Sequence, residues 1–134
     1  MMEKEQVETI LRRIFKGGPL RRMPKKREDA DLVLALSLVG LDPVKSFDES
    51  DINVQLSAWL DGIAQENSAA DYVAMRRDLV DHGFLRRATD GAIYRIEQAR
   101  VDEIIAPSAR DVDPKAIYAE VLQIRQQRRE AFRQ

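Results

Sequence analysis

A helix that ends at a glycine and leads directly into a tight hairpin places the strongest limit on how this chain can fold. Apolar residues at helical spacing cover residues 69–82, and Gly83 follows them. A glycine at this place is typical of the left-handed residue that ends a helix. The next residues, FLRRATDGAIYRI, form two short runs around Asp90 and Gly91, a strong signal for a β-hairpin turn. The pattern predicts a helix over residues 69–82 and a two-stranded hairpin after it.

Two more helices are predicted nearer the start of the chain. Residues 3–15 place apolar side chains at the i, i+3, i+4 and i+7 spacing of one helix face, and the sequence KGGPL ends this pattern. Residues 27–39 are apolar on nearly all sides of a helical wheel, as expected for a helix at the centre of a domain. A buried strand would also fit this run, but its leucine and alanine content favours a helix.

The sequence SFDESDINVQLSAWLDGI predicts another helix, with two alternatives for its first residue. Asp48 can act as the N-cap, or Ser46 and Glu49 can form a capping box. For the helix before the hairpin, Asn67 or Ser68 is the expected N-cap.

Residues 97–134 are predicted to form a C-terminal helical extension. A helical turn is expected within residues 98–105, and Asp113 followed by Pro114 marks the start of a last helix over residues 114–132. The apolar stripe of this helix is Ile117, Val121, Ile124 and Ala131. Its basic end holds Arg125, Arg128, Arg129 and Arg133. The helix could pack against residues 3–15 of its own chain or pair with a second subunit.

The order of these elements predicts the fold class. Helix, helix, turn, helix and hairpin is the order of a winged-helix domain. We therefore expect a mainly α protein with a small β-hairpin (α+β). A winged-helix-like domain would cover residues 1–96, and the C-terminal amphipathic helix would lie in the extension over residues 97–134.

Composition excludes several classes of function. The net charge of the 134 residues is −1, and there is no cysteine to form a disulfide or a thiolate metal site. The one histidine, His82, lies at a predicted helix end, where an imidazole can contact the last carbonyls. No catalytic constellation is recognisable, so we expect a protein that is not an enzyme and binds no cofactor or metal. The charged start MMEKEQVETI and the lack of an apolar run of about 20 residues predict a cytoplasmic protein with no membrane partner.

Three blocks of residues carry a resemblance to a known family. The first block is Phe15, Gly18, Leu20, Pro24 and Lys26. The second block is Phe47, Asp48, Glu49, Asp51, Ile52 and Asn53. The third block is Asp71, Tyr72, Met75, Arg76, Arg77, Leu79, Val80, Asp81, Gly83, Phe84, Leu85, Arg87, Gly91 and Tyr94. Over about residues 11–96 the chain resembles a bacterial family of winged-helix-like domains of unknown function, found alone or fused to ArsR-type helix-turn-helix regulators. The resemblance implies a regulatory role; Phe47 and Asp48 depart from the tyrosine and threonine of the family pattern.

Arg76 is predicted to form a structural ion pair. It falls within the apolar stripe of its helix, and a buried arginine needs a paired acid. Glu49 is the expected partner, because it lies in the first turn of its helix at the edge of the buried face. Asp51 is the second choice.

Two groups of basic residues are candidates for contacts with phosphates. The first group, in the basic segment over residues 12–27, is Arg21, Arg22, Lys25 and Lys26. The second group, in and beside the hairpin, is Arg77, Arg86, Arg87 and Arg95. The alternative is that these side chains are solvated, or neutralised by the acids of residues 42–71.

The helix before the hairpin is a poor reader of bases, since Asp71, Asp78 and Asp81 on its outer side would be repelled by phosphates. The leading hypothesis is a DNA-associated transcriptional regulator that contacts phosphates through the hairpin and the basic segment and forms a homodimer through its C-terminal helix. The alternative is a protein-protein interaction module with the winged-helix shape that does not bind DNA.

Overall fold

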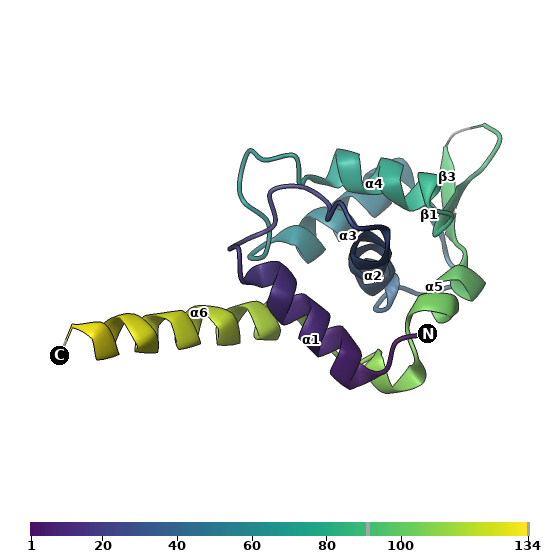
Figure 1. The fold of residues 1–134 in the computed structure, drawn as a ribbon. Helices are drawn as coiled ribbons and strands as arrows, with labels where there is room; N and C mark the ends of the chain where they lie inside the picture. Colours follow the sequence, from purple (N-terminus) through teal and green to yellow (C-terminus); the bar gives the residue numbers. More distant parts are fainter. Residues whose placement is uncertain (91, 134) are drawn as a thin grey trace.

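The computed structural model describes residues 1–90 and 92–133 and is mainly helical, with a small antiparallel sheet at one end (Figure 1). Its helices are α1 (Lys4–Phe15), α2 (Arg27–Leu38), α3 (Glu49–Leu60), α4 (Tyr72–Asp81), α5 (Gln98–Ile104) and α6 (Pro114–Phe132), with a 3-10 turn at Pro107–Ala109. Its strands are β1 (Ser46–Asp48), β2 (Leu85–Arg87) and β3 (Ile93–Ile96). The predicted α+β class is confirmed.

The helix α2 lies at the centre of the body, with α4 and α5 packed against it (Figure 1). Every residue from Asp29 to Leu38 is buried, as expected for a helix that is apolar on nearly all sides. The burial includes two carboxylates, Asp29 and Asp31, which the apolar pattern did not point to. Most of their partners lie outside α2 and are described below.

The sheet has three strands in the order β1-β3-β2, all antiparallel, so the two-stranded prediction was incomplete. Phe47 of β1 lies opposite Tyr94 of β3, and both side chains are buried. A strand of three residues directly before a helix is too short to show a period-2 pattern. Only its pairing with β3 reveals it.

The residue that ends β1 also begins α3. The side chain of Asp48 accepts a hydrogen bond from the backbone N–H of Asp51 at 2.7 Å. Asp48 is therefore the N-cap, and Ser46 pairs in the sheet instead of forming a capping box.

The helix α4 begins at Tyr72, later than the predicted residue 69. Its N-cap is Asp71, whose side chain accepts a hydrogen bond from the N–H of Ala74 at 2.8 Å. The prediction of Asn67 or Ser68 as N-cap was wrong. Asn67 adopts a left-handed φ of 58°, and the Ser68 hydroxyl bonds to backbone within the same turn. Asparagine and serine favour turns for the same reason that they favour N-caps, because their side chains bond to nearby backbone groups.

The helix α4 ends at a left-handed glycine, with a φ of 82° at Gly83. The N–H of Gly83 donates to the carbonyl of Val80 at 3.1 Å, and the N–H of Phe84 donates to the carbonyl of Leu79 at 2.8 Å. These two bonds form a Schellman motif. Leu79 and Phe84 are both fully buried, so the helix end is anchored in the core.

The predicted hairpin turn falls partly outside the described residues, because Gly91 is not among them. The side chain of Asp90 accepts a hydrogen bond from the N–H of Ala92 at 3.1 Å. The paired strands place Arg86 directly opposite Arg95.

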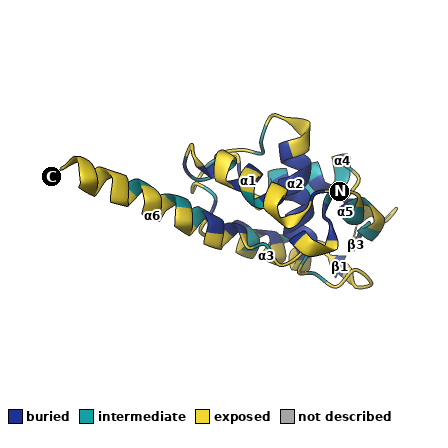
Figure 2. Ribbon diagram, turned by 60° about the horizontal axis from the view of Figure 1, so that its bottom comes forward, coloured by how far each residue is buried: buried dark blue, intermediate teal, exposed yellow. Residues whose placement is uncertain are grey.

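One apolar core joins the two predicted parts of the chain. Val101, Ile105 and Ile117 from the C-terminal extension lie in the same buried cluster as Leu32 and Phe84. Beyond its first turns, α6 projects away from the body (Figures 1 and 2). Within residues 1–90 and 92–133, no helix combines the length and the apolar character needed to cross a membrane.

Candidate functional site

Arg76 connects α4 to α3. Its Nη2 atom lies 3.3 Å from Oε1 of Glu49, the expected acid, and its Nη1 atom donates to Oδ1 of Asn53. The hydroxyl of Tyr94 also donates to Oε1 of Glu49, at 3.4 Å. The side chain of Arg76 is 15% exposed and that of Glu49 is 48% exposed. The cation is thus largely buried, while the acid remains half in solvent.

Asn53 was not predicted as a partner of Arg76, although a signal was present. It lies four residues after Glu49, so both side chains occupy one face of α3. Asp51, the second choice, makes no ion pair with any part of the chain that the structure describes.

Three arginines meet around a pocket of about 390 Å³ between α4, α3 and the sheet. The pocket is lined by Glu49, Arg76, Arg77, Val80, Asp81, Arg87 and Tyr94. The guanidinium of Arg87 lies 6.0 Å from the centre of the Tyr94 ring. Because Glu49 and Asp81 line the pocket together with the three cations, the charge of its lining is mixed.

Arg86 and Arg95 lie on the other face of the sheet. They occupy opposite positions on β2 and β3, and Ser46 of β1 lies on the far side of Arg95. Both arginines are exposed, and Arg86 forms an ion pair with Glu97 at 3.0 Å. Within residues 1–90 and 92–133, Arg95 forms no ion pair. Two like charges directly opposite each other destabilise a sheet in the absence of an anion.

The basic segment is separate from the hairpin, in the connection between α1 and α2. Arg21, Arg22 and Lys25 are exposed there, and Lys26 lies 4.0 Å from Glu28. The acids that neutralise the neighbouring cations come from the start of α2, and none of the ion pairs in the described chain joins this segment to the acids of residues 42–71. The predicted phosphate contacts therefore fall on three surfaces: the pocket, the outer face of the sheet and this connection.

The carboxylate of Asp31 is contacted by side-chain nitrogen atoms from three elements. Its carboxylate lies 2.8 Å from Nδ1 of His82, 3.1 Å from Nη2 of Arg100 and 3.6 Å from Nε of Arg27. Arg100 also donates from Nε to the carbonyl of His82 at 3.1 Å. The helix-end carbonyl is thus contacted by Arg100, and the expectation that the imidazole would take that role was wrong. The imidazole is directed instead to an acid on α2.

Two carboxyl groups have shifted pKa values. The two hydrogen bonds from Arg13, at 2.8 and 2.9 Å, and the charge of that residue hold the pKa of Asp29 below its ordinary value of 3.8. Burial raises the pKa of Asp78 above the same ordinary value; His82 opposes the increase, and the charge of Asp81 adds to it. Asp78 and Asp81 lie near the C-terminal end of α4, where the helix dipole disfavours negative charge.

The pattern of acids on α4 limits what this helix can contact. Asp78 is partly buried and Asp81 is exposed on the pocket side, beside Arg77. A helix inserted in the major groove would bring such carboxylates close to phosphates. On the outer face of the sheet, Arg95 forms no ion pair with any described residue, while Arg86 is paired with Glu97.

Comparison with known proteins places residues 19–96 in a family. They match the model of DUF2087, described as an uncharacterized protein conserved in bacteria. The matched range runs from the connection before α2 to the end of β3 and contains the pocket and the sheet. No curated protein and no solved structure matches the chain.

Proposed function

The chain belongs to the DUF2087 family of uncharacterized bacterial proteins, and we propose that this member is a transcriptional regulator of winged-helix type that associates with DNA through phosphate contacts. The proposal rests on the order α2, β1, α3, α4, β2, β3, which is typical of winged-helix domains. In such domains the helix before the hairpin and the hairpin itself face the nucleic acid. A DNA-associated protein of a bacterium works in the cytoplasm, and the proposal assigns no catalytic step to it.

The observation that carries the proposal is the pair formed by Arg86 and Arg95. Their direct opposition across β2 and β3 destabilises the sheet in the absence of an anion. Glu97 compensates Arg86 alone. A phosphate placed between the two guanidinium groups would remove the repulsion and accept hydrogen bonds from both.

Contacts of this kind fix position without reading sequence. The acids Asp78 and Asp81 keep α4 from a base-reading role, so binding should depend on charge and on salt rather than on a particular site. Arg77 and Arg87 can add contacts from the pocket side, next to Tyr94.

Fluorescence anisotropy with a labelled random-sequence duplex, measured over a series of salt concentrations, tests the proposal. We expect binding at about 50 mM salt that weakens steeply as salt rises. Replacing Arg86 and Arg95 by serine should reduce the slope of log K against log salt by about 1–2, because each lost phosphate contact contributes about 0.9.

The matched control replaces Lys4 and Arg110, two exposed cations outside the sheet and the basic segment, by serine. It removes the same net charge from another surface, so its slope should stay close to that of the unchanged protein. Absence of binding to any duplex at about 50 mM salt would overturn the proposal, since charge-driven binding is strongest at low salt.

A protein-interaction module is the second candidate. The observation in its favour is that Glu49 and Asp81 line the pocket together with three arginines, which suits the mixed charges of a protein surface better than a polyanion. The same salt series separates the two candidates, because a module of this kind would not bind the duplex.

A further inference from the structure

The distal half of α6, residues 122–132, makes no ion pair or ring contact with the body within residues 1–90 and 92–133. Near its start, the ring of Tyr118 packs on Phe15 at 5.0 Å between centroids, and Glu120 lies 3.4 Å from Arg12. Farther along, Leu122 is 44% exposed, Ile124 is 40% exposed and Phe132 is 95% exposed. Figure 2 shows this part of the helix as an exposed rod that leaves the body.

The same half of α6 carries a row of like charges. Arg125, Arg129 and Arg133 follow each other at i, i+4 spacing, with Arg128 beside them. In the part of the chain that the structure describes, none of the four forms an ion pair. Like charges at this spacing destabilise a helix, whereas an acidic partner would stabilise it.

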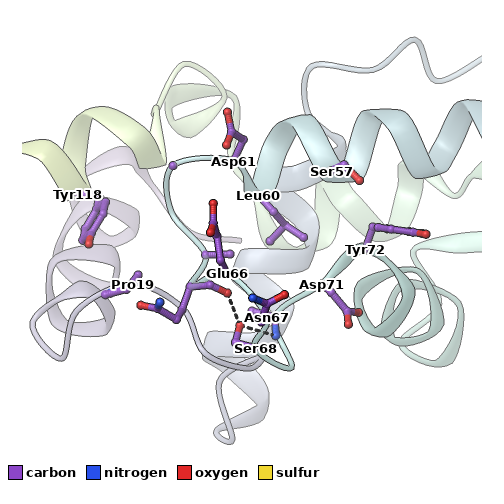
Figure 3. Close-up of a pocket in the computed structure, with 14 residues that line it drawn as sticks. Pro19, Ser57, Leu60, Asp61, Glu66, Asn67, Ser68, Asp71, Tyr72 and Tyr118 are labelled. Atoms are coloured by element: carbon purple, nitrogen blue, oxygen red, sulfur yellow. Dashed lines mark hydrogen bonds between the residues drawn. The ribbon is translucent and has the colours of Figure 1, made fainter.

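A groove with the opposite charge begins where α6 leaves the body. It has a volume of about 660 Å³ and is formed by the end of α3, the connection to α4 and Tyr118. Figure 3 shows Asp61 and Glu66 between Tyr118 on one side and Tyr72 on the other. Among the described residues that line the groove there is no lysine or arginine, and Asp71 adds a third acid.

The groove also offers apolar surface. At Ser57 and Tyr72 it continues into a second hollow between α3 and α4. Val54, which is 63% exposed, and Tyr72, which is 39% exposed, lie along this continuation. A helix with both exposed apolar residues and arginines is complementary to such a surface in both respects.

We propose that the distal half of α6 docks into the acidic groove of a second copy of this chain, and that the contact is reciprocal. The distal half of α6 cannot occupy the groove of its own chain, because α6 is one continuous helix that leads away from that groove. Parallel pairing of two α6 helices would set arginine against arginine. A two-fold dimer in which each helix occupies the groove of the partner avoids both problems.

The contact area reaches the lower limit for a specific dimer. The part of α6 beyond its contacts with the body, residues 122–132, is about 16 Å long and about 10 Å across. Covering half of its surface against the groove, twice in the dimer, removes about 1,000 Å² from water, the lower limit for a specific interface.

Sedimentation equilibrium with charge-reversed pairs tests the proposal. The unchanged protein should show twice the 15.4 kDa mass of one chain. One variant carries Arg125→Glu and Arg129→Glu; a second carries Asp61→Arg and Glu66→Arg. Each alone should dissociate, with the Kd of the dimer raised at least about 100-fold, because like charges then face each other in both contacts.

An equimolar mixture of the two variants should restore the dimer, because each contact then joins opposite charges. A control with Lys25→Glu and Lys26→Glu, which makes the same charge change in the connection before α2, should remain dimeric. Circular dichroism melts confirm that each variant is folded.

A monomeric wild type at all concentrations would overturn the proposal. The proposal would also be overturned if the groove variant remained dimeric, because α6 would then pair with a surface other than the groove. Either result leaves the phosphate proposal untouched, because Arg86 and Arg95 are unchanged in these variants.

Discussion

The Nδ1 atom of His82, at the end of α4, lies 2.8 Å from a carboxylate oxygen of Asp31, which is buried in α2. Arg100 of α5 contacts the second oxygen of that carboxylate at 3.1 Å. One acid thus fixes the positions of three helices relative to each other. Since β2 follows directly after α4, this cluster also determines where the hairpin and its arginines lie.

Removing the Asp31 carboxylate should make the folded protein less stable. We expect Asp31→Asn to lower the free energy of unfolding by about 2–3 kcal/mol, because His82 and Arg100 are only 20% and 23% exposed and would lose their acid. Urea unfolding at neutral pH measures the change. As a control, Asp111→Asn breaks an exposed pair with Lys4 and should cost less than about 1 kcal/mol. Equal effects of the two substitutions would contradict the role of Asp31.

The pair of Asp29 and Arg13 should make stability sensitive to acid. Because the pKa of Asp29 is lower in the folded chain than its ordinary 3.8, the unfolded chain binds more protons. The resulting stability is complete above that ordinary value and is lost as the pH falls through the lower, folded pKa. Urea unfolding should be measured from pH 6 down through the folded pKa of Asp29. The free energy of unfolding should then fall more steeply with pH for the unchanged protein than for Asp29→Asn. Parallel curves would show that the pair contributes nothing.

Arg76→Ala should lower the melting temperature. The substitution removes the contacts with Glu49 and Asn53 and leaves the hydroxyl of Tyr94 as a partner of that acid. We expect a loss of about 1–2 kcal/mol, below that of a fully buried pair because Glu49 is half exposed. If the pair is the cause, Glu49→Gln should cost little more in the Arg76→Ala background. An unchanged melting midpoint for Arg76→Ala would rule out the structural role.

Gly83→Ala should strain the end of α4. A left-handed φ of 82° costs a residue with a side chain about 1–2 kcal/mol, while the added Cβ would meet its nearest neighbour, Arg100, at an ordinary 4.0 Å. The loss thus reports backbone strain and not a clash. Gly40→Ala is the matched control, because nothing lies within 4 Å of its Cβ and its φ is not left-handed. Thermal melting of both variants should show a decrease for the first only.

The helices that can be predicted are those whose signals are local. The last helix was predicted over residues 114–132 and is found there, because Asp113 and Pro114 mark its start within a single turn. The left-handed end at Gly83 follows from the same short-range logic. By contrast, the start of α4 was misplaced at residue 69, since Asn67 and Ser68 fit a turn as well as a cap.

The candidate site could be predicted only in part. The burial of Arg76 followed from its place in an apolar stripe, and this narrowed its partner to the acids at the start of α3. The strand β1 could not be predicted, because it is defined by hydrogen bonds to β3. The sequence also did not show which face of the sheet each arginine occupies. Arg87 faces the pocket, while Arg86 and Arg95 lie on the opposite face.

The sequence alone determined which segments become helices and where most of them end, because periodicity and capping act over a few neighbouring residues. Only the tertiary structure decided that Asp31 meets His82 and Arg100, and that the distal half of α6 projects away from the rest of the described chain. Such relationships depend on how whole helices pack, and the residues beside Asp31 in the sequence do not identify its distant partners.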